Sequence, residues 1–147
     1  MSSPAVDVRG PRFAAWVTLV VLAVVLLTSS WLLLAVQALV FALGTFFGTR
    51  YAPYGVVYRT LVAPRLRPPT EFEDAAPPRF AQGVGLVFAL VGTVGFAAGV
   101  PAVGLAATAL ALVAAFLQAA FGLCLGCEMY LLIRRVTGPR PALPSDM

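Results

Sequence analysis

The sequence predicts an all-α membrane protein whose four transmembrane helices form two tandem hairpins. The chain is 61% hydrophobic and 11% charged, and its mean hydropathy is +0.94, whereas a soluble domain is about half apolar and about a quarter charged. The apolar residues fall in four long runs, and every charged residue except Glu128 lies outside them. We therefore expect one integral membrane domain over residues 1–147 and no separate soluble domain.

Each apolar run is close to the ~20 residues that a helix needs to cross ~30 Å of hydrocarbon. The runs cover residues 13–27, 31–47, 80–100 and 102–133. Only Thr28-Ser29-Ser30 separates the first two and Gly99-Val100-Pro101 the last two, which predicts tight turns. The expected segments are a first helical hairpin at 13–48, a cytoplasmic loop at 49–79, a second hairpin at 80–134 and a flexible tail at 135–147.

The positive charges predict how the chain is oriented in the membrane. All ten basic residues are arginines, and neither predicted hairpin turn carries a charge. Arginines concentrate on the cytoplasmic side of membrane proteins. We therefore expect a multi-pass protein of the bacterial inner membrane with cytoplasmic termini, and no nucleic-acid partner despite the net charge of +4. The arginines are Arg9, Arg12, Arg50, Arg59, Arg65, Arg67, Arg79, Arg134, Arg135 and Arg140.

Similar segments open the two predicted hairpins. Pro11-Arg12-Phe13-Ala14 begins the first, and Pro78-Arg79-Phe80-Ala81 begins the second. Because both hairpins have the same orientation, this favours a parallel internal repeat over coincidence in a low-complexity alphabet.

Small and polar residues predict helix contacts inside the bundle. Glycines four residues apart let helix backbones approach closely. Such pairs near the cytoplasmic ends of the second and fourth helices predict that these helices touch there, and the two intramembrane glutamines are expected to form hydrogen bonds across the interior. The glycine pairs are Gly44/Gly48, Gly95/Gly99 and Gly122/Gly126, and the glutamines are Gln37 and Gln118.

The two cysteines, Cys124 and Cys127, lie at the cytoplasmic end of the fourth run. The Cys-x-x-Cys spacing lets two thiols share a disulfide, a metal or a transferred sulfur. In a continuous helix both would lie on one face, and Gly126 would let that turn yield to a disulfide. Glu128 follows at once, where it would affect thiol ionisation and either snorkel or pair with an arginine such as Arg134. These two cysteines and Glu128 are the candidate catalytic residues.

Three interpretations of the thiol pair remain open. The thiols pack as small apolar groups, exchange disulfides or sulfur with a soluble cytoplasmic partner, or handle a soft metal such as copper or mercury. A zinc site is disfavoured because four ligands are usual and the chain has no histidine. In the exchange scheme one cysteine attacks and the other resolves, and a quinone or a partner must accept the electrons. The non-enzymatic alternative is a membrane scaffold or subunit.

The segment between the hairpins contains Tyr51, Tyr54 and Tyr58 beside Arg50 and Arg59. This composition predicts a short amphipathic piece in the headgroup layer. Whether it is a plain basic linker or covers the thiols is left open.

Three segments of the chain resemble a known family. Pro11-Arg12-Phe13, Pro77-Pro78-Arg79-Phe80-Ala81-Gln82 and Phe121-Gly122-Leu123-Cys124-Leu125-Gly126-Cys127-Glu128-Met129-Tyr130 are similar to a bacterial, largely actinobacterial family of small four-helix membrane proteins, the domain of unknown function 4395. The resemblance extends from about Val8 to Arg135, and it implies no assigned activity or cofactor. It implies thioredoxin-like or rhodanese-like proteins as partners, which favours thiol or sulfur chemistry.

Overall fold

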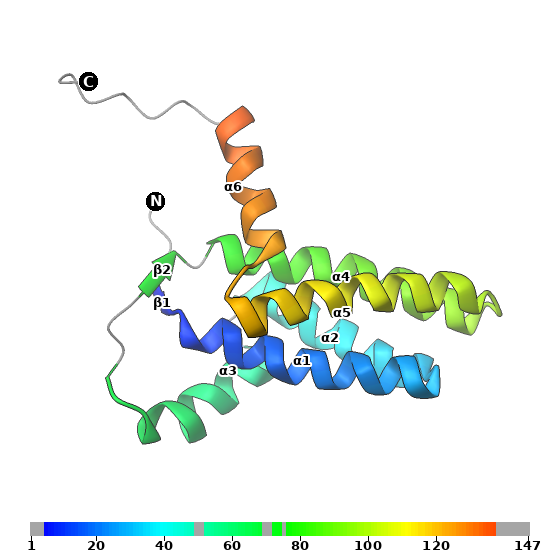
Figure 1. Cartoon of the computed structure of the whole chain (residues 1–147), viewed down its shortest axis with the longest axis horizontal. Helices are drawn as coiled ribbons and strands as arrows, with labels where there is room; N and C mark the ends of the chain where they lie inside the picture. Colours follow the sequence, from blue (N-terminus) through cyan, green and yellow to red (C-terminus); the bar gives the residue numbers. More distant parts are fainter. Residues whose placement is uncertain (1–4, 49–51, 69–71, 75, 138–147) are drawn as a thin grey trace.

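The computed structural model describes residues 5–48, 52–68, 72–74 and 76–137. Four apolar helices lie side by side: α1 (Arg9–Thr28), α2 (Trp31–Phe47), α4 (Ala76–Ala97) and α5 (Pro101–Phe121) (Figure 1). The other elements gather at one end of this bundle. They are β1 (Ala5–Asp7), α3 (Pro53–Val57), the π-helical turn η2 (Tyr58–Val62), the 3-10 turn η3 (Ala63–Arg65), β2 (Phe72–Asp74) and α6 (Leu125–Thr137).

The fold is helical, as the sequence predicts, apart from one short ribbon. Strands β1 and β2 pair antiparallel, with Ala5 opposite Asp74. The loop predicted at 49–79 contains α3, η2 and η3, and α4 begins inside it at Ala76. Helix α6 continues to Thr137, beyond the start of the predicted tail. Arg50, Tyr51 and Arg140 lie outside the described residues.

The helix packing crosses between the two sequential helix pairs. Helix α2 packs mainly against α4, and α1 packs mainly against α5, while α4 and α5 also lie together. The turn between α1 and α2 places Ser29 at a φ of 53° and uses the Ser30 hydroxyl to accept from the Leu33 N–H at 3.2 Å. The turn between α4 and α5 contains Gly99, and Pro101 begins α5. Both turns lie at the end of the bundle opposite α6.

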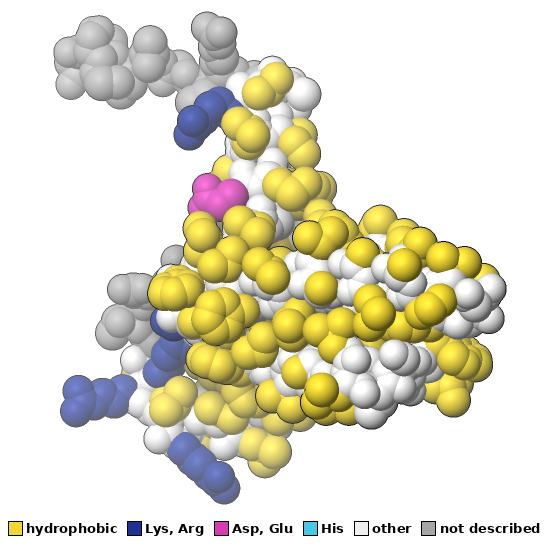
Figure 2. Space-filling model, turned by 45° about the vertical axis from the view of Figure 1, so that its right-hand side comes forward, with side chains coloured by type: hydrophobic (Ala, Val, Ile, Leu, Met, Phe, Trp, Pro, Cys, Tyr) yellow, Lys and Arg dark blue, Asp and Glu magenta, His cyan; other side chains and the backbone are white. Residues whose placement is uncertain are grey.

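The outer surface of the bundle is apolar. Many large side chains that face outward are hydrophobic, among them Val20, Leu32, Leu39, Val94 and Leu110. Figure 2 shows hydrophobic side chains along the bundle and arginine side chains gathered toward one end. Helices α1, α4 and α5 are long and apolar enough to cross a membrane, and α2 is a shorter apolar helix of 17 residues. Such an exposed apolar surface is expected of a protein surrounded by lipid.

The fourth apolar run is not one helix, so its predicted continuation to Ile133 is wrong. Helix α5 ends at Phe121 because Gly122 adopts a φ of 70°, and its N–H bonds to the Gln118 carbonyl at 3.0 Å. A left-handed glycine in this position ends a helix. Helix α6 then leaves the bundle in a different direction (Figure 1). The thiols therefore lie at the start of a separate helix.

The glycine pairs do not form the predicted contact between the second and fourth helices. In each pair one glycine has a positive φ, and the other lies where a side chain would collide with a neighbouring element. Gly48, Gly99 and Gly122 are the positive-φ members. In each pair, therefore, one glycine forms a turn of the chain and the other allows two helices to approach closely. Helix α2 packs mainly against α4, not against α5.

Two arginines tie the helix pairs together in equivalent ways. Arg12 of α1 donates to the carbonyls of Ala119 at 3.0 Å and Ala120 at 3.4 Å, near the end of α5. Arg79 of α4 donates to the carbonyls of Thr45 and Phe46 near the end of α2, the latter at 2.7 Å. A guanidinium here satisfies carbonyls that a helix end leaves unpaired and complements its partial negative charge.

Aromatic contacts extend this correspondence to the shorter helices. The rings of Phe13 and Tyr58 lie 5.8 Å apart, and those of Phe80 and Tyr130 lie 5.6 Å apart. Each phenylalanine directly follows one of the two arginines. The segment α3–η2 against α1 thus occupies the place that α6 occupies against α4.

Candidate functional site

Cys124 and Cys127 form a disulfide at the N-terminal end of α6. Cys124 precedes the helix and Cys127 lies in its first turn, with the two Cα atoms 5.1 Å apart. This Cα–Cα distance is within the range for a disulfide. Because Cys124 lies outside α6, the bond forms without unwinding the helix. The sequence predicts the right pair but places it in the last turn of a long helix, whereas the structure places it at the start of a separate one.

The backbone at this site favours negative charge on Cys124. The Cys127 N–H donates to Cys124 Sγ at 3.1 Å, and the Glu128 N–H donates to the Cys124 carbonyl at 3.0 Å. The first N–H groups of a helix have no partner within it and carry partial positive charge. A thiolate formed on Cys124 would therefore be stabilised by the helix that follows it.

Gly126, between the two cysteines, sets the disulfide close against α4. A Cβ atom at Gly126 would lie 2.6 Å from both Cα and Cβ of Ala81. The Phe80–Tyr130 ring contact holds the next turn of α6 against the same helix. Only glycine fits at this position, so Gly126 is a packing residue rather than a hinge for the disulfide.

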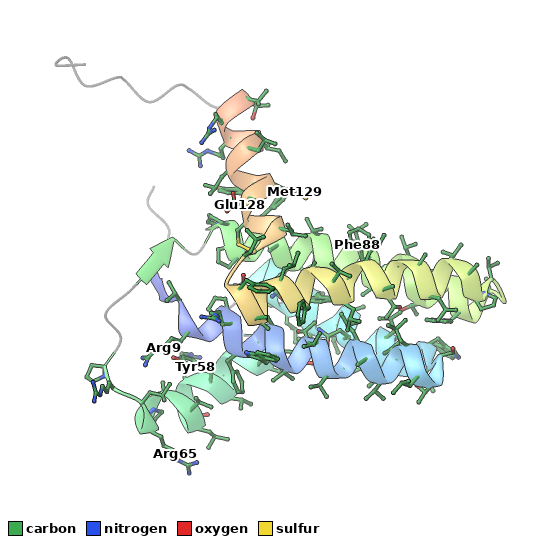
Figure 3. The ribbon with its side chains drawn as sticks, viewed as in Figure 1. Arg9, Tyr58, Arg65, Phe88, Glu128 and Met129 are labelled. Atoms are coloured by element: carbon green, nitrogen blue, oxygen red, sulfur yellow. A yellow bond between two sulfur atoms is a disulfide. The ribbon has the colours of Figure 1, made fainter. Side chains whose placement is uncertain are left out.

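The disulfide lines a cavity of about 490 Å³ within the bundle. The wall is mostly apolar and includes Phe41, Val84, Phe88 and Leu110. Small side chains on α1 and α5 leave the space open, and every helix contributes to the lining. Ligand cavities in proteins commonly have this volume and an apolar wall with a few polar groups. Figure 3 shows Met129, which also lines the cavity, where α6 meets the bundle.

Several polar side chains also line the cavity. Gln82 of α4 and Gln118 of α5 contribute amides, and Thr18 and Tyr54 contribute hydroxyls. Tyr54 donates to Gln37 Oε1 at 2.7 Å, and burial raises the pKa of Tyr54, which keeps it protonated. Within the described part of the chain, Gln37 Nε2 and Gln118 Oε1 are buried without a hydrogen-bond partner. The predicted bonding across the interior thus joins Gln37 to α3 and leaves Gln118 incompletely paired.

The central segment lies at the same site. Tyr54, Tyr58 and Arg59 line the cavity together with both cysteines. The central segment therefore borders the same cavity as the two cysteines, and α3 and η2 pack against α1. The tyrosines could be named from the sequence, but their part in the site could not, because it depends on α3 folding back against α1.

Glu128 does not point into the cavity. It is exposed, is not part of the lining, and lies on α6 near its junction with the bundle (Figure 3). Arg134, its expected partner, donates to the Tyr130 hydroxyl at 3.1 Å and stacks over that ring. No ion pair joins Glu128 and Arg134, both of which are described. No hydrogen bond joins the Glu128 side chain to the sulfur of Cys124 or Cys127, all three of which are described.

Gln82 is a cavity residue whose role the sequence did not reveal, and it belongs to a segment that carries the family resemblance, which is a signal that could have singled it out. Gly126 does allow the close approach that its glycine pair predicts, but against α4 rather than between the second and fourth helices. Among the described residues, no group of three or more His, Cys, Asp or Glu is placed to hold a metal ion. The two sulfurs are bonded to each other.

The thiol site exists in only one half of the chain. Cys124 and Cys127 precede Tyr130 by six and three residues, and the same offsets from Tyr58 lead to Ala52 and Gly55. Ala52 also stands immediately before its helix, α3. The equivalent place at the other side of the bundle therefore has the backbone arrangement without sulfur.

Comparisons with known proteins give one match. The model of a family described as a domain of unknown function (DUF4395) matches residues 6–135. The match includes both arginines that cap helices and both cysteines. The curated proteins and the solved structures give no match to the chain.

Proposed function

Given that this chain belongs to the family of the domain of unknown function 4395, we propose that it is a membrane-embedded thiol–disulfide exchange protein that acts on a soluble cytoplasmic partner. One observation carries the proposal. The only two cysteines of the chain form a disulfide at a helix N-terminus, beside a cavity. Disulfides in a reducing cytoplasm are usually transient and catalytic.

The proposed orientation places the thiols on the cytoplasmic side of a bacterial inner membrane. In this arrangement α1, α2, α4 and α5 all cross the bilayer as two tandem hairpins that form a parallel internal repeat. Supporting this, the arginines lie toward the end of the bundle that carries α6, away from both tight turns. Helix α2 would span about 26 Å at ~1.5 Å per residue, which is at the short end of transmembrane lengths. The repeat is supported by the equivalent contacts of Arg12 and Arg79.

The exchange reaction balances without any other group. A thiolate of the reduced partner attacks one sulfur of the Cys124–Cys127 disulfide and releases the other as a thiolate. The second partner thiol then resolves the mixed disulfide, so the partner becomes oxidised and this chain gains two thiols. In the reverse direction Cys124 is the attacking sulfur, because the Cys127 N–H stabilises its thiolate, and Cys127 resolves. A thioredoxin-like protein, with two thiols in a Cys-x-x-Cys motif, supplies partner chemistry of this kind.

Trapping tests this assignment. Cys127→Ser should accumulate a mixed disulfide between Cys124 and a cytoplasmic thiol protein, seen as a band that disappears on reduction. Cys124→Ser should trap less, because the sulfur that the helix activates is missing. Leu132→Ala, on the exposed side of α6, is the matched control and should trap nothing. Absence of any reducible adduct in both cysteine variants would leave the non-enzymatic scaffold as the better account.

A further inference from the structure

We propose that the cavity beside the disulfide binds the ring of a membrane quinone, which oxidises the Cys124–Cys127 dithiol. This inference rests on the proposed exchange function and names the electron acceptor for the same site. Oxidising the dithiol forms one S–S bond and releases two electrons and two protons. The chain has no other cysteine to receive these electrons. A quinone accepts two electrons and two protons, becomes a quinol and moves within the bilayer.

The position of the cavity suits a ligand that arrives from the membrane. Its lining begins at the disulfide and continues along α5 from Gln118 to Leu110, which is about 12 Å at ~1.5 Å per residue. Leu125 and Met129 line the cavity and are also exposed, so it opens beside α6. Both the disulfide and the hydrocarbon interior thus border one space.

The cavity is large enough to admit a ligand ring. Protein interiors are close-packed, and voids larger than a water molecule are few. Here Ala14, Ala15, Ala111, Ala114 and Ala115 line the space, and the small side chains leave room between the helices. Phe41 and Phe88 contribute flat apolar surface. A planar ring with apolar edges matches this wall, which is too apolar to hold ordered water along its length.

The polar groups match a ligand that changes between hydrogen-bond acceptor and donor. Quinone carbonyls accept hydrogen bonds, and quinol hydroxyls also donate them. The amides of Gln82 and Gln118 and the hydroxyl of Thr18 can each donate or accept. Gln118 Oε1 is buried without a partner in the described chain, and an unpaired buried acceptor is costly. A quinol hydroxyl would satisfy it.

The redox step involves one dithiol and one quinone. The sulfurs of Cys124 and Cys127 form the S–S bond, the two electrons enter the quinone ring, and the two thiol protons end on the two quinone oxygens. The products are the disulfide seen here and one quinol. The soluble partner then reduces the disulfide again, so electrons pass from the partner through this chain to the quinone pool.

The test uses the full chain, purified in detergent and reduced with dithiothreitol, which is then removed without oxygen. Decylubiquinone is the probe, because its fully substituted ring cannot add thiols. Quinone absorbance and maleimide-reactive thiols are followed together. We expect one quinone consumed for each disulfide formed, with saturation as the quinone concentration rises. If dithiothreitol reduces the disulfide but quinone does not restore it, this inference fails and the exchange function stands. If dithiothreitol leaves the disulfide intact, the exchange function itself fails.

Variants then test whether the cavity is the site. Ala114→Phe fills the cavity and should slow the quinone reaction by more than about tenfold. Gln118→Leu keeps the size of the side chain but removes the amide, and should raise the half-saturating quinone concentration about tenfold. Val113→Phe, whose position faces outward at 53% exposure, is the matched control and should behave as the unmodified chain. Equal rates in the unmodified protein and in both cavity variants would overturn the proposal.

Discussion

The two halves of the bundle share their frame but not their chemistry. In each half an arginine caps a helix of the other half, a phenylalanine stacks on a tyrosine, and a positive-φ glycine ends the second helix. Only the second half has cysteines at the start of its short helix. The first half has Ala52 and Gly55 at the equivalent positions. The contacts that set the architecture are thus separable from the residues that make a site.

The cavity amides show the same division. Gln82 follows Arg79 by the distance at which Ala15 follows Arg12, and Gln118 precedes Gly122 by the distance at which Gly44 precedes Gly48. Gln82 contacts Gly44, since a Cβ there would lie 2.8 Å from Gln82 Oε1. Each glutamine of the second half therefore corresponds to a small residue of the first. Side chains of both halves line the cavity, but its amides and its sulfurs all come from the second half.

The largest expected effect comes from removing sulfur from the second half. Cys124→Ser and Cys127→Ser should each abolish exchange, and the double variant should be no worse than either alone, because the two sulfurs act as one unit. Function is measured as the ability of each variant to reverse the phenotype of a deletion strain. Two residues that only pack would instead lose stability in additive steps, and full function in the double Ala variant would contradict the account.

The next effect separates the two kinds of glycine. Gly126→Leu should destabilise the fold by about 3 kcal/mol, because its side chain would overlap Ala81 of α4. Gly48→Leu should cost about 1–3 kcal/mol through its backbone conformation alone, since its φ of 95° and ψ of 152° suit only glycine and a Cβ there meets nothing within 4 Å. Thermal unfolding in detergent measures both, and Gly48→Ala should cost nearly as much as Gly48→Leu, because the strain lies in the backbone. A Gly48→Ala variant as stable as the unmodified chain would mean that Gly48 acts by packing, as Gly126 does.

The arginines test whether the halves are equivalent. Arg12→Ala and Arg79→Ala should each lower stability by about 2 kcal/mol, because each frees two helix-end carbonyls from a charged donor. Arg65→Ala is the control and should have little effect, since Arg65 points away from the bundle (Figure 3). A neutral Arg12→Ala beside a damaging Arg79→Ala would break the correspondence.

The smallest effect concerns Tyr54, which belongs to the short helix of the first half, α3. Tyr54→Phe should cost about 1 kcal/mol, because Gln37 Oε1 loses its donor. Burial raises the pKa of Tyr54 in the folded state. Its contribution is therefore complete below the ordinary tyrosine pKa of about 10 and decreases as the pH rises through the folded value. Unfolding measured from pH 8 to pH 11 should show an alkaline decline that is smaller in Tyr54→Phe, and identical slopes would contradict this.

The sequence predicts helices well where one property decides them. Apolar length locates α1, α2, α4 and α5, and Ser30 and Pro101 mark the starts of α2 and α5. The break at Gly122 could not be predicted, because glycine inside an apolar run fits both a helix contact and a helix end. Which of the two occurs depends on α6 packing against Ala81.

The site divides in the same way. Spacing alone identifies Cys124 and Cys127, since two thiols three residues apart can bond in several backbone conformations. The cavity could not be predicted, because it arises from small side chains on α1 and α5 that meet only in the folded bundle. Glu128 stands out in the sequence because it is the one acidic residue within an apolar run. That property does not determine the direction of its side chain.

The most direct test of the account is the redox state and sidedness of Cys124 and Cys127 in native membranes. A membrane-impermeant maleimide is applied to inverted vesicles and to intact spheroplasts, before and after a dithiol reductant. We predict labelling only in inverted vesicles and strongly increased by reduction, since the proposed function requires a reducible disulfide on the cytoplasmic side. Full labelling without reduction, or labelling from the outer side, would contradict the central claim.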